Sequence, residues 1–170
     1  FSRFDLQIKE LYKLYQQHPC ITTDSRDCPE GSIFLALKGE SFNGNKFAES
    51  ALEKGCAYAI IDEPEYKKDE RFIVVKDCLQ TFKDLAREHR RQYDIPVIGI
   101  TGTNGQTTTK ELIRAVLSEC YNVMATEGNF NNDVGVPKTL FRLNDSHDIA
   151  VVEMGASHPG DIKTLAETAE

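Results

Sequence analysis

The sequence predicts an α/β protein, with a small α/β domain followed by the first part of a domain built on a parallel sheet. Short apolar runs typical of buried strands alternate along the chain with segments whose apolar residues recur at helical spacing. From residue 96 onward this alternation becomes a regular strand–helix repeat, which predicts a parallel sheet covered by helices. Ligands of such sheets bind beyond the carboxyl ends of the strands, so the loops there are the first candidates for function.

The overall composition is that of a globular protein and argues against several classes of partner. The chain has 170 residues, 40% of them hydrophobic and 28% charged, which suits one ordinary domain or two small ones. The net charge of −7 argues against nucleic acid and anionic membranes, because both require a basic surface. No apolar run approaches the ~20 residues of a membrane-spanning helix.

The five cysteines and four histidines show no metal-binding spacing. There is no C-x-x-C pair, and an odd number of widely separated cysteines without a secretion signal favours reduced thiols in the cytosol. We therefore expect a cytoplasmic protein without a cysteine–histidine metal site, in which the histidines face solvent or cap helices.

In the first half of the chain we expect three helices and four short strands. Helical spacing covers residues 4–17, and Asn45 is placed to cap a second helix whose inward positions include Phe47. A third helix starts at Asp77, with apolar side chains and His89 along one side. The strands are expected to begin at residue 21 and to cover residues 32–37, 57–61 and 72–75.

In the second half the pattern repeats as strand, loop and helix. The expected strands cover residues 96–100, 122–126 and 149–153, and the expected helices lie at about 107–119, from about 136, and over 161–170. We place the boundary in the helix that connects the halves, which gives domains 1–80 and 81–170. Three strands are a small core for such a domain, so we expect it to be truncated and to continue beyond residue 170.

The loop after the strand at 96–100 has the features of a phosphate-binding loop. Glycines at 99, 102 and 105 let the backbone N–H groups turn toward one point, where a new helix adds its unpaired N–H groups and positive dipole end. The hydroxyl of Thr107 stands where such loops hold Mg²⁺. The usual lysine before it is replaced by Gln106, which donates a hydrogen bond but carries no charge. The alternative is a glycine-rich turn that binds nothing.

Two further loops follow strand ends and therefore converge on the same edge. Glu153 ends the third strand of this domain, where a carboxylate either holds Mg²⁺, directly or through water, or caps the next turn. Residues 127–137 are dense in amide side chains and glycine. Such groups suit a ligand with many hydrogen-bonding positions, such as a phosphorylated sugar, or they form a turn and a helix cap.

Taken together, these motifs resemble the Mur ligases, ATP-dependent enzymes that add amino acids or a dipeptide to the peptidoglycan precursor. The motifs that carry the resemblance lie at residues 23–26, 37–44, 101–109, 128–137 and 153–156. Gln106 replaces the family's lysine, and Asn43 stands where aspartate is usual. The last two motifs resemble the family member that joins D-alanyl-D-alanine to UDP-N-acetylmuramoyl-tripeptide. The preceding enzyme typically has Glu-x-Ser-Ser-His at the last motif, which this chain lacks.

The resemblance implies a mechanism in which ATP phosphorylates the tripeptide's terminal carboxylate and the dipeptide amine attacks the acyl phosphate. The implied nucleotide-binding residues are Gly102, Thr103, Asn104, Gly105, Gln106, Thr107 and Thr108, with Thr107 and Glu153 on Mg²⁺. The implied ligands of the UDP part are Ser25, Arg26, Lys38, Gly39 and Asn43, and Asn131 and Asn132 would hold the substrate near the transferred phosphate. The family's carboxylated lysine, its histidine and aspartate, and its C-terminal domain are expected beyond residue 170.

We expect a fragment that is inactive alone and comes from a monomeric ligase. Its partners would be UDP-N-acetylmuramoyl-tripeptide and D-alanyl-D-alanine, with ATP and Mg²⁺ as cofactors and no nucleic acid or membrane. Two alternatives stay open: a non-catalytic nucleotide- or UDP-sugar-binding module, suggested by Gln106, and a Mur ligase that adds a different residue.

Overall fold

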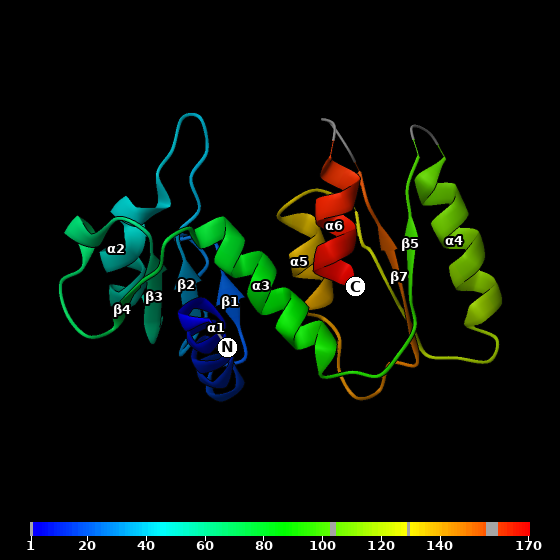
Figure 1. Ribbon diagram of the computed structural model, residues 1–170, viewed down its shortest axis with the longest axis horizontal. Coiled ribbons are helices and arrows are strands. Elements are labelled where there is room, and N and C mark those ends of the chain that lie inside the picture. Colours follow the sequence, from blue (N-terminus) through cyan, green and yellow to red (C-terminus); the bar gives the residue numbers. More distant parts are fainter. Residues whose placement is uncertain (1, 103–104, 129, 156–159) are drawn as a thin grey trace. The chain divides into compact units, whose positions relative to one another are not determined.

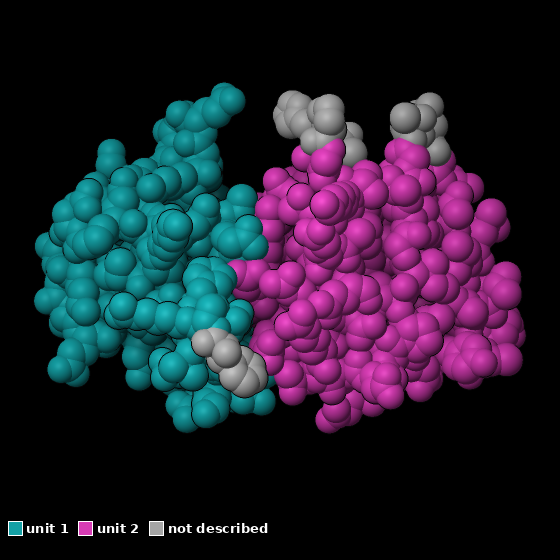
Figure 2. Space-filling view, viewed as in Figure 1, with its two compact units in different colours: residues 1–82 teal, residues 83–170 magenta. Residues whose placement is uncertain are grey.

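The computed structural model describes residues 2–102, 105–128, 130–155 and 160–170. The chain divides into two compact units, Phe1–Phe82 and Lys83–Glu170 (Figure 2). Each unit contains its own parallel sheet, as Figure 1 shows. The predicted α/β class with parallel strands is therefore confirmed.

The first unit is a four-stranded parallel sheet with strand order β1-β2-β3-β4. Its elements are α1 (Arg3–Gln17), β1 (Ile21–Thr22), β2 (Ile33–Leu35), η1 (Gly44–Phe47), α2 (Ala48–Glu53), β3 (Tyr58–Ile61), η2 (Pro64–Tyr66), β4 (Phe72–Val74) and the start of α3 (Cys78–Arg91). Every strand runs in the same direction, so the loops that follow β1, β2, β3 and β4 share one edge of the sheet.

Local chemistry explains where these elements begin. Ser2 and Asp5 form a reciprocal capping box that starts α1, and four of its apolar side chains are buried. Asn43, rather than the predicted Asn45, caps the first helical turn of η1, because its side-chain oxygen accepts the Asn45 N–H. Phe47 was expected to point inward but is exposed, since it ends η1 before α2 turns its own apolar face to the sheet.

The second unit is a three-stranded parallel sheet with strand order β5-β7-β6. Its elements are the rest of α3, β5 (Val97–Ile100), α4 (Gln106–Leu117), β6 (Val123–Ala125), α5 (Gly135–Leu140), β7 (Ile149–Glu153) and α6 (Asp161–Ala169). All the strands and helices predicted after residue 95 are present, although α4 starts one residue earlier than expected.

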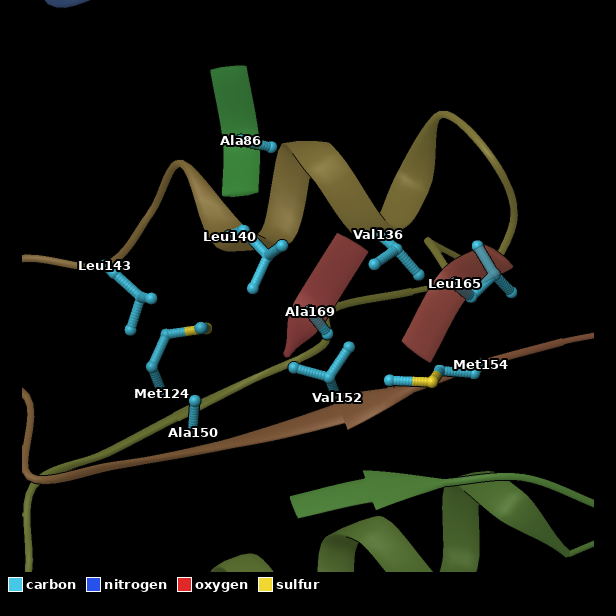
Figure 3. Close-up of a cluster of buried hydrophobic side chains, with 10 residues drawn as sticks. All are labelled: Ala86, Met124, Val136, Leu140, Leu143, Ala150, Val152, Met154, Leu165 and Ala169. Atoms are coloured by element: carbon cyan, nitrogen blue, oxygen red, sulfur yellow. The ribbon is translucent and has the colours of Figure 1, made fainter. Parts of the chain in front are cut away.

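The second unit has three layers, with helices on both faces of the sheet. Successive residues of β7 point to opposite faces and pack against different helices. Ala150 and Val152 pack with α5 and α6, in the cluster drawn in Figure 3. Val151 packs on the other face, where partly buried side chains of α4 complete a smaller cluster. The sheet is therefore covered on both faces (Figure 1), and its carboxyl edge remains as the place where loops meet.

His89 departs from the expectation that the histidines face solvent. It is buried on α3, its Nε2 lies 2.9 Å from the carbonyl oxygen of Leu143, and its ring packs against Tyr93 and Phe141. Burial lowers the pKa of His89, and the hydrogen bond to Leu143 only partly opposes this effect. The apolar spacing along α3 already placed His89 on the inward side, and that signal outweighs the polarity of its ring.

Candidate functional site

The three loops predicted to carry function follow β5, β6 and β7 at the carboxyl edge of the second sheet. In the register of the sheet Ile100 pairs with Glu153, so the end of β7 lies directly beside the start of the glycine-rich loop. Thr126 joins the loop after β6 to this point, since its backbone N–H donates to the Val151 carbonyl and its hydroxyl accepts from the Glu153 N–H at 2.9 Å. The topology therefore brings the three segments together.

The glycine-rich loop enters α4 through a residue with left-handed backbone geometry. Gly105 has φ 78°, which glycine adopts without strain, and a Cβ built there would meet nothing within 4 Å. The first turn of α4 then presents Gln106, Thr107 and Thr108. Thr107 and Thr108 are exposed, while Thr103 and Asn104 lie outside the described residues. A loop that opens into the start of a twelve-residue helix is a ready anion site.

The side chain of Gln106 forms hydrogen bonds to the backbone of the loops around it. Its side-chain amide donates to the Gly102 carbonyl and lies 3.4 Å from the carbonyl oxygen of Met154, which directly follows β7. Gln106 thus links two of the three loops, a contact that its sequence position alone did not predict. An uncharged amide in these contacts leaves the charge of a bound phosphate to be balanced by other groups.

A cation close to these loops is Lys110, which sequence reasoning missed. Lys110 lies one turn after Gln106 on α4 and is only 3% exposed. Its Nζ donates to the Thr126 carbonyl at 2.7 Å and lies 3.3 Å from Glu153 Oε1. A lysine four residues after the phosphate-loop position falls on the same helix face, and that spacing is the signal that would have found it.

Glu153 sits where it was predicted, but in a more enclosed setting than a strand end suggests. It is 2% exposed, and its Oε1 makes no hydrogen bond to the described part of the chain. The ion pair with Lys110 compensates the charge of the carboxylate without meeting hydrogen-bond geometry. A buried carboxylate oxygen that still has acceptor capacity fits a cation ligand.

These residues fit Mg²⁺ as a partly hydrated ion. Within the described ranges no three histidine, cysteine or acidic side chains converge as a metal site. Mg²⁺ is typically held by one or two protein oxygens, with water and substrate phosphates completing its shell. Glu153 and the Thr107 hydroxyl on the first turn of α4 supply oxygens of this kind.

The two asparagines of the loop after β6 play different local roles. The side-chain oxygen of Asn132 accepts the backbone N–H of Gly135 at 2.8 Å and that of Val134 at 3.3 Å, so it caps the start of α5. The Asn131 carbonyl accepts the Gly155 N–H at 2.7 Å, and its carboxamide lies against Gly155. Asn131 therefore connects the loop after β6 to the segment after β7, whereas Asn132 already has its acceptor engaged.

A second group of predicted residues lies at the carboxyl edge of the first sheet. Lys38 Nζ lies 3.2 Å from Asp62 Oδ1 and 3.5 Å from Glu63 Oε1. The Asn43 amide donates to Glu63 Oε2 at 2.6 Å, so Lys38 and Asn43 share one acidic partner. The pKa of Lys38 is raised, chiefly by its hydrogen bond to Asp62.

Ser25 and Arg26 occupy the turn after β1 at the same edge. Arg26 is exposed and pairs with Asp24 at 3.0 Å, and the Ser25 carbonyl accepts a hydrogen bond from Lys54 Nζ at 2.9 Å. A guanidinium held by a neighbouring carboxylate is available for exchange with a phosphate, since exposed ion pairs are weak.

Two hollows accompany this edge of the first unit. One of about 410 Å³ is lined by Glu40, Ser41, Phe42, Asn43, Lys46 and Phe47. Phe42 and Phe47 are both exposed there, and the Phe42 ring rests on Gly39, where any Cβ would collide with it. The other, of about 330 Å³, lies between Lys38, Asp62 and the start of α3. The aromatic pair is a feature that sequence reasoning did not identify.

No helix within the described ranges combines the length and apolar character needed to cross a bilayer.

Comparison with known families gives two adjacent matches. The Mur ligase family, catalytic domain, matches residues 19–98, and the Mur ligase middle domain matches residues 100–170. Among curated proteins, the chain is 45% identical to a UDP-N-acetylmuramoyl-tripeptide–D-alanyl-D-alanine ligase from Synechocystis sp. and 42% identical to the ligase of that name from Escherichia coli. These alignments cover 88% and 84% of the chain but 34% and 31% of the relatives.

Solved structures give the same family. MurF from Acinetobacter baumannii superposes with a TM-score of 0.83 at 39% identity, covering 88% of this chain and 33% of that one. MurF ligase from Thermotoga maritima in complex with ADP superposes with a TM-score of 0.81 at 34% identity, covering 88% and 35%. The chain thus spans about a third of the length of the relatives that it matches. On these matches, which follow one another along nearly its whole length, the chain belongs to the Mur ligase family.

Proposed function

We propose that this chain is the UDP-precursor-binding domain and the opening of the ATP-binding domain of a MurF-type ligase. The complete protein would join D-alanyl-D-alanine to UDP-N-acetylmuramoyl-tripeptide at the expense of ATP. The observation that carries the proposal is the edge where the glycine-rich loop, the start of α4 and the buried Glu153 meet. The relatives' names and the ADP bound to the Thermotoga maritima MurF support it.

The residues of this chain would bind and orient the nucleotide. Backbone N–H groups at the start of α4 would receive the phosphates, where the helix dipole favours negative charge. Thr107 and Glu153 would hold Mg²⁺, which when bound neutralises charge that develops during phosphoryl transfer. The carboxylate that accepts the phosphoryl group, and the amine that then attacks the acyl phosphate, come from the substrates.

Gln106 should weaken nucleotide binding but not abolish it. Losing a charge-assisted hydrogen bond costs about 1.5–3 kcal/mol in binding. Losing a cation where charge develops in phosphoryl transfer slows the reaction by on the order of 10³. The helix dipole and the backbone donors remain, so we expect weak binding together with severely reduced turnover.

Calorimetry with Mg-ADP tests the phosphate site. The chain should bind weakly, and Gln106→Lys should tighten binding by roughly ten- to a hundredfold, the equivalent of one charge-assisted contact. Gln92→Lys, in the turn directly after α3, is the matched control for added charge and should leave the affinity unchanged. Equal affinities for Gln106→Lys and the unmodified chain would show that residue 106 does not face a phosphate.

A non-catalytic binding module is the second candidate, and the contacts of Gln106 with two carbonyl groups favour it. The complete protein should be assayed with the tripeptide precursor and D-alanyl-D-alanine, as it stands and with Gln106→Lys. ADP formation by the lysine variant supports the ligase, whereas no ADP from either version supports the binding module. Preferential turnover of a free amino acid would point instead to another Mur ligase reaction.

For the first unit we propose that the UDP part binds at the edge that carries Ser25, Arg26, Lys38, Gly39 and Asn43. The lysine and arginine would neutralise the diphosphate. The hollow beside Phe42 and Phe47 is wide enough for a pyrimidine, and exposed rings there suit base stacking. The cytoplasmic location and the monomeric state remain predictions from the sequence.

A further inference from the structure

The ammonium group of Lys110 lies at the meeting point of the three loops of the second unit. It comes from α4, which follows the first loop, it donates to the Thr126 carbonyl of the second, and it pairs with Glu153 at the start of the third. A second carboxylate oxygen, Glu111 Oε1, lies 3.3 Å away. Lys110 is 3% exposed, so its charge is balanced by protein groups rather than by water.

Glu153 and the Lys110 ammonium form an ion pair without a hydrogen bond. The two groups lie 3.3 Å apart, yet Glu153 Oε1 is buried and has no hydrogen-bond partner among the described residues. Its acceptor capacity is therefore unused while its charge is compensated. Such a buried oxygen can coordinate a second cation only when other negative charge offsets the repulsion between that cation and the ammonium group.

We infer that Lys110 is the built-in counter-cation of Glu153 and that it opposes binding of a free divalent cation there. This inference rests on the proposed role of Glu153 as a Mg²⁺ ligand. A divalent ion on Oε1 would place two cations a few ångströms apart in a poorly solvated site, where repulsion is strong. The phosphates of a nucleotide bring the negative charge that lets both cations stay. Metal and nucleotide therefore enter together, and Lys110 acts as a positioning residue.

The test measures binding of Mn²⁺ alone, by electron paramagnetic resonance of the free ion. Lys110→Gln removes the charge but keeps a donor for the Thr126 carbonyl, and Lys110→Arg keeps the charge. We expect Lys110→Gln to bind Mn²⁺ at least tenfold more tightly than the unmodified chain, and Lys110→Arg to resemble the unmodified chain. The double variant Lys110→Gln/Glu153→Gln should lose the gain.

Equal Mn²⁺ affinity in Lys110→Gln and the unmodified chain overturns the inference, as does a gain that survives in the double variant. If Lys110→Gln does not fold, paramagnetic broadening in the unmodified chain decides the question. Mn²⁺ alone should leave the amide signals of Thr126 and Glu153 sharp, and Mn-ADP should broaden them. Broadening by Mn²⁺ alone would show that Lys110 does not exclude the ion.

Binding of metal-free ADP to the same samples separates the two proposals. If ADP does not bind but Lys110→Gln still gains Mn²⁺ affinity through Glu153, the nucleotide proposal fails and the role of Lys110 stands. If ADP binds but Lys110→Gln does not change the Mn²⁺ affinity, the nucleotide proposal stands and the inferred role of Lys110 fails.

Discussion

Two glycines near the carboxyl edge of the second sheet meet different physical demands. Gly105 needs its left-handed backbone, with φ 78°, but has open space around it. Gly135, at the start of α5, lies so close to Phe130 that a Cβ would meet its Cα and carbonyl carbon at 2.4 Å. The first glycine is required by conformation, and the second by the approach of another stretch of backbone.

Alanine at the two positions should therefore have unequal effects. Gly105→Ala should lower the free energy of unfolding by about 1 kcal/mol, the cost of a left-handed non-glycine residue. Gly135→Ala should cost about 3 kcal/mol, because backbone has to move to make room. Urea unfolding of both variants measures the difference, and equal losses would contradict the close approach of Phe130.

The exposed ring of Phe42 gives a prediction for the first unit. Phe42→Ala should weaken UDP binding by roughly 5- to 100-fold, the range expected for one lost base–aromatic stack. Stability should hardly change, because the ring is 55% exposed. Phe4→Ala, on the exposed side of α1, serves as the control. Unchanged UDP affinity in Phe42→Ala would place the base elsewhere.

At the scale of elements, the helices of the second unit contribute unequally to its stability. Side chains of α5 and α6 form the larger cluster with β7, and Leu140 is fully buried there. On α4, Leu112 is 64% exposed. Leu140→Ala should cost about 2–5 kcal/mol, while Leu112→Ala should stay within about 0.5 kcal/mol of the unmodified chain. Chemical denaturation checks both values, and a large loss in Leu112→Ala would mean that α4 packs more deeply than described.

The helix α3 makes stability depend on pH through His89. Burial lowers the pKa of folded His89 below its usual value near 6.5. As the pH falls below about 6.5, His89 of the unfolded chain is protonated before His89 of the folded chain, because its pKa is higher. The free energy of unfolding therefore decreases. His89→Gln, which keeps a donor for Leu143, should show a shallower decrease between about pH 7 and 5.

The matched control for that experiment is His147→Gln. The pKa of His147 is also lowered, by burial and by Arg142, but this side chain is half-exposed. The His147 variant should keep the part of the pH dependence that belongs to His89. If the free energy of unfolding of His89→Gln falls with decreasing pH as steeply as that of the unmodified chain, the pKa of His89 does not differ between the folded and unfolded states.

At the scale of the whole molecule, hydrophobic spacing sufficed to predict the order of elements and the parallel sheet of the second unit. Alternation and strand–helix repeats are set by backbone geometry, which the sequence reports directly. The path of a long side chain is reported less directly. Helical spacing places Lys110 on the same face of α4 as Gln106, but it does not say that Lys110 pairs with Glu153. Phe47 was misplaced because its burial depends on which neighbour covers it, whereas the spacing along α3 already placed His89 on the inward side.

The sequence predicted the parts of the candidate site that follow from sheet topology. It did not predict the parts that depend on which side chains form hydrogen bonds or ion pairs. Glu153 and the glycine-rich loop follow neighbouring parallel strands, so their meeting is a consequence of the sheet. The hydrogen bonds of Asn132 to the start of α5 show that its side-chain oxygen caps the helix. Its contact with a substrate stays a prediction. Whether Asn131 also contacts a substrate stays a prediction.

Amide chemical-shift mapping with ADP tests the nucleotide site in the chain as it stands. The nucleotide should shift signals of residues 100–102, 105–108, 126 and 153–155, and leave residues 2–82 unchanged. Saturating ADP that leaves the loops of the second sheet unshifted, or that shifts only residues of the first unit, would contradict a phosphate site at the start of α4.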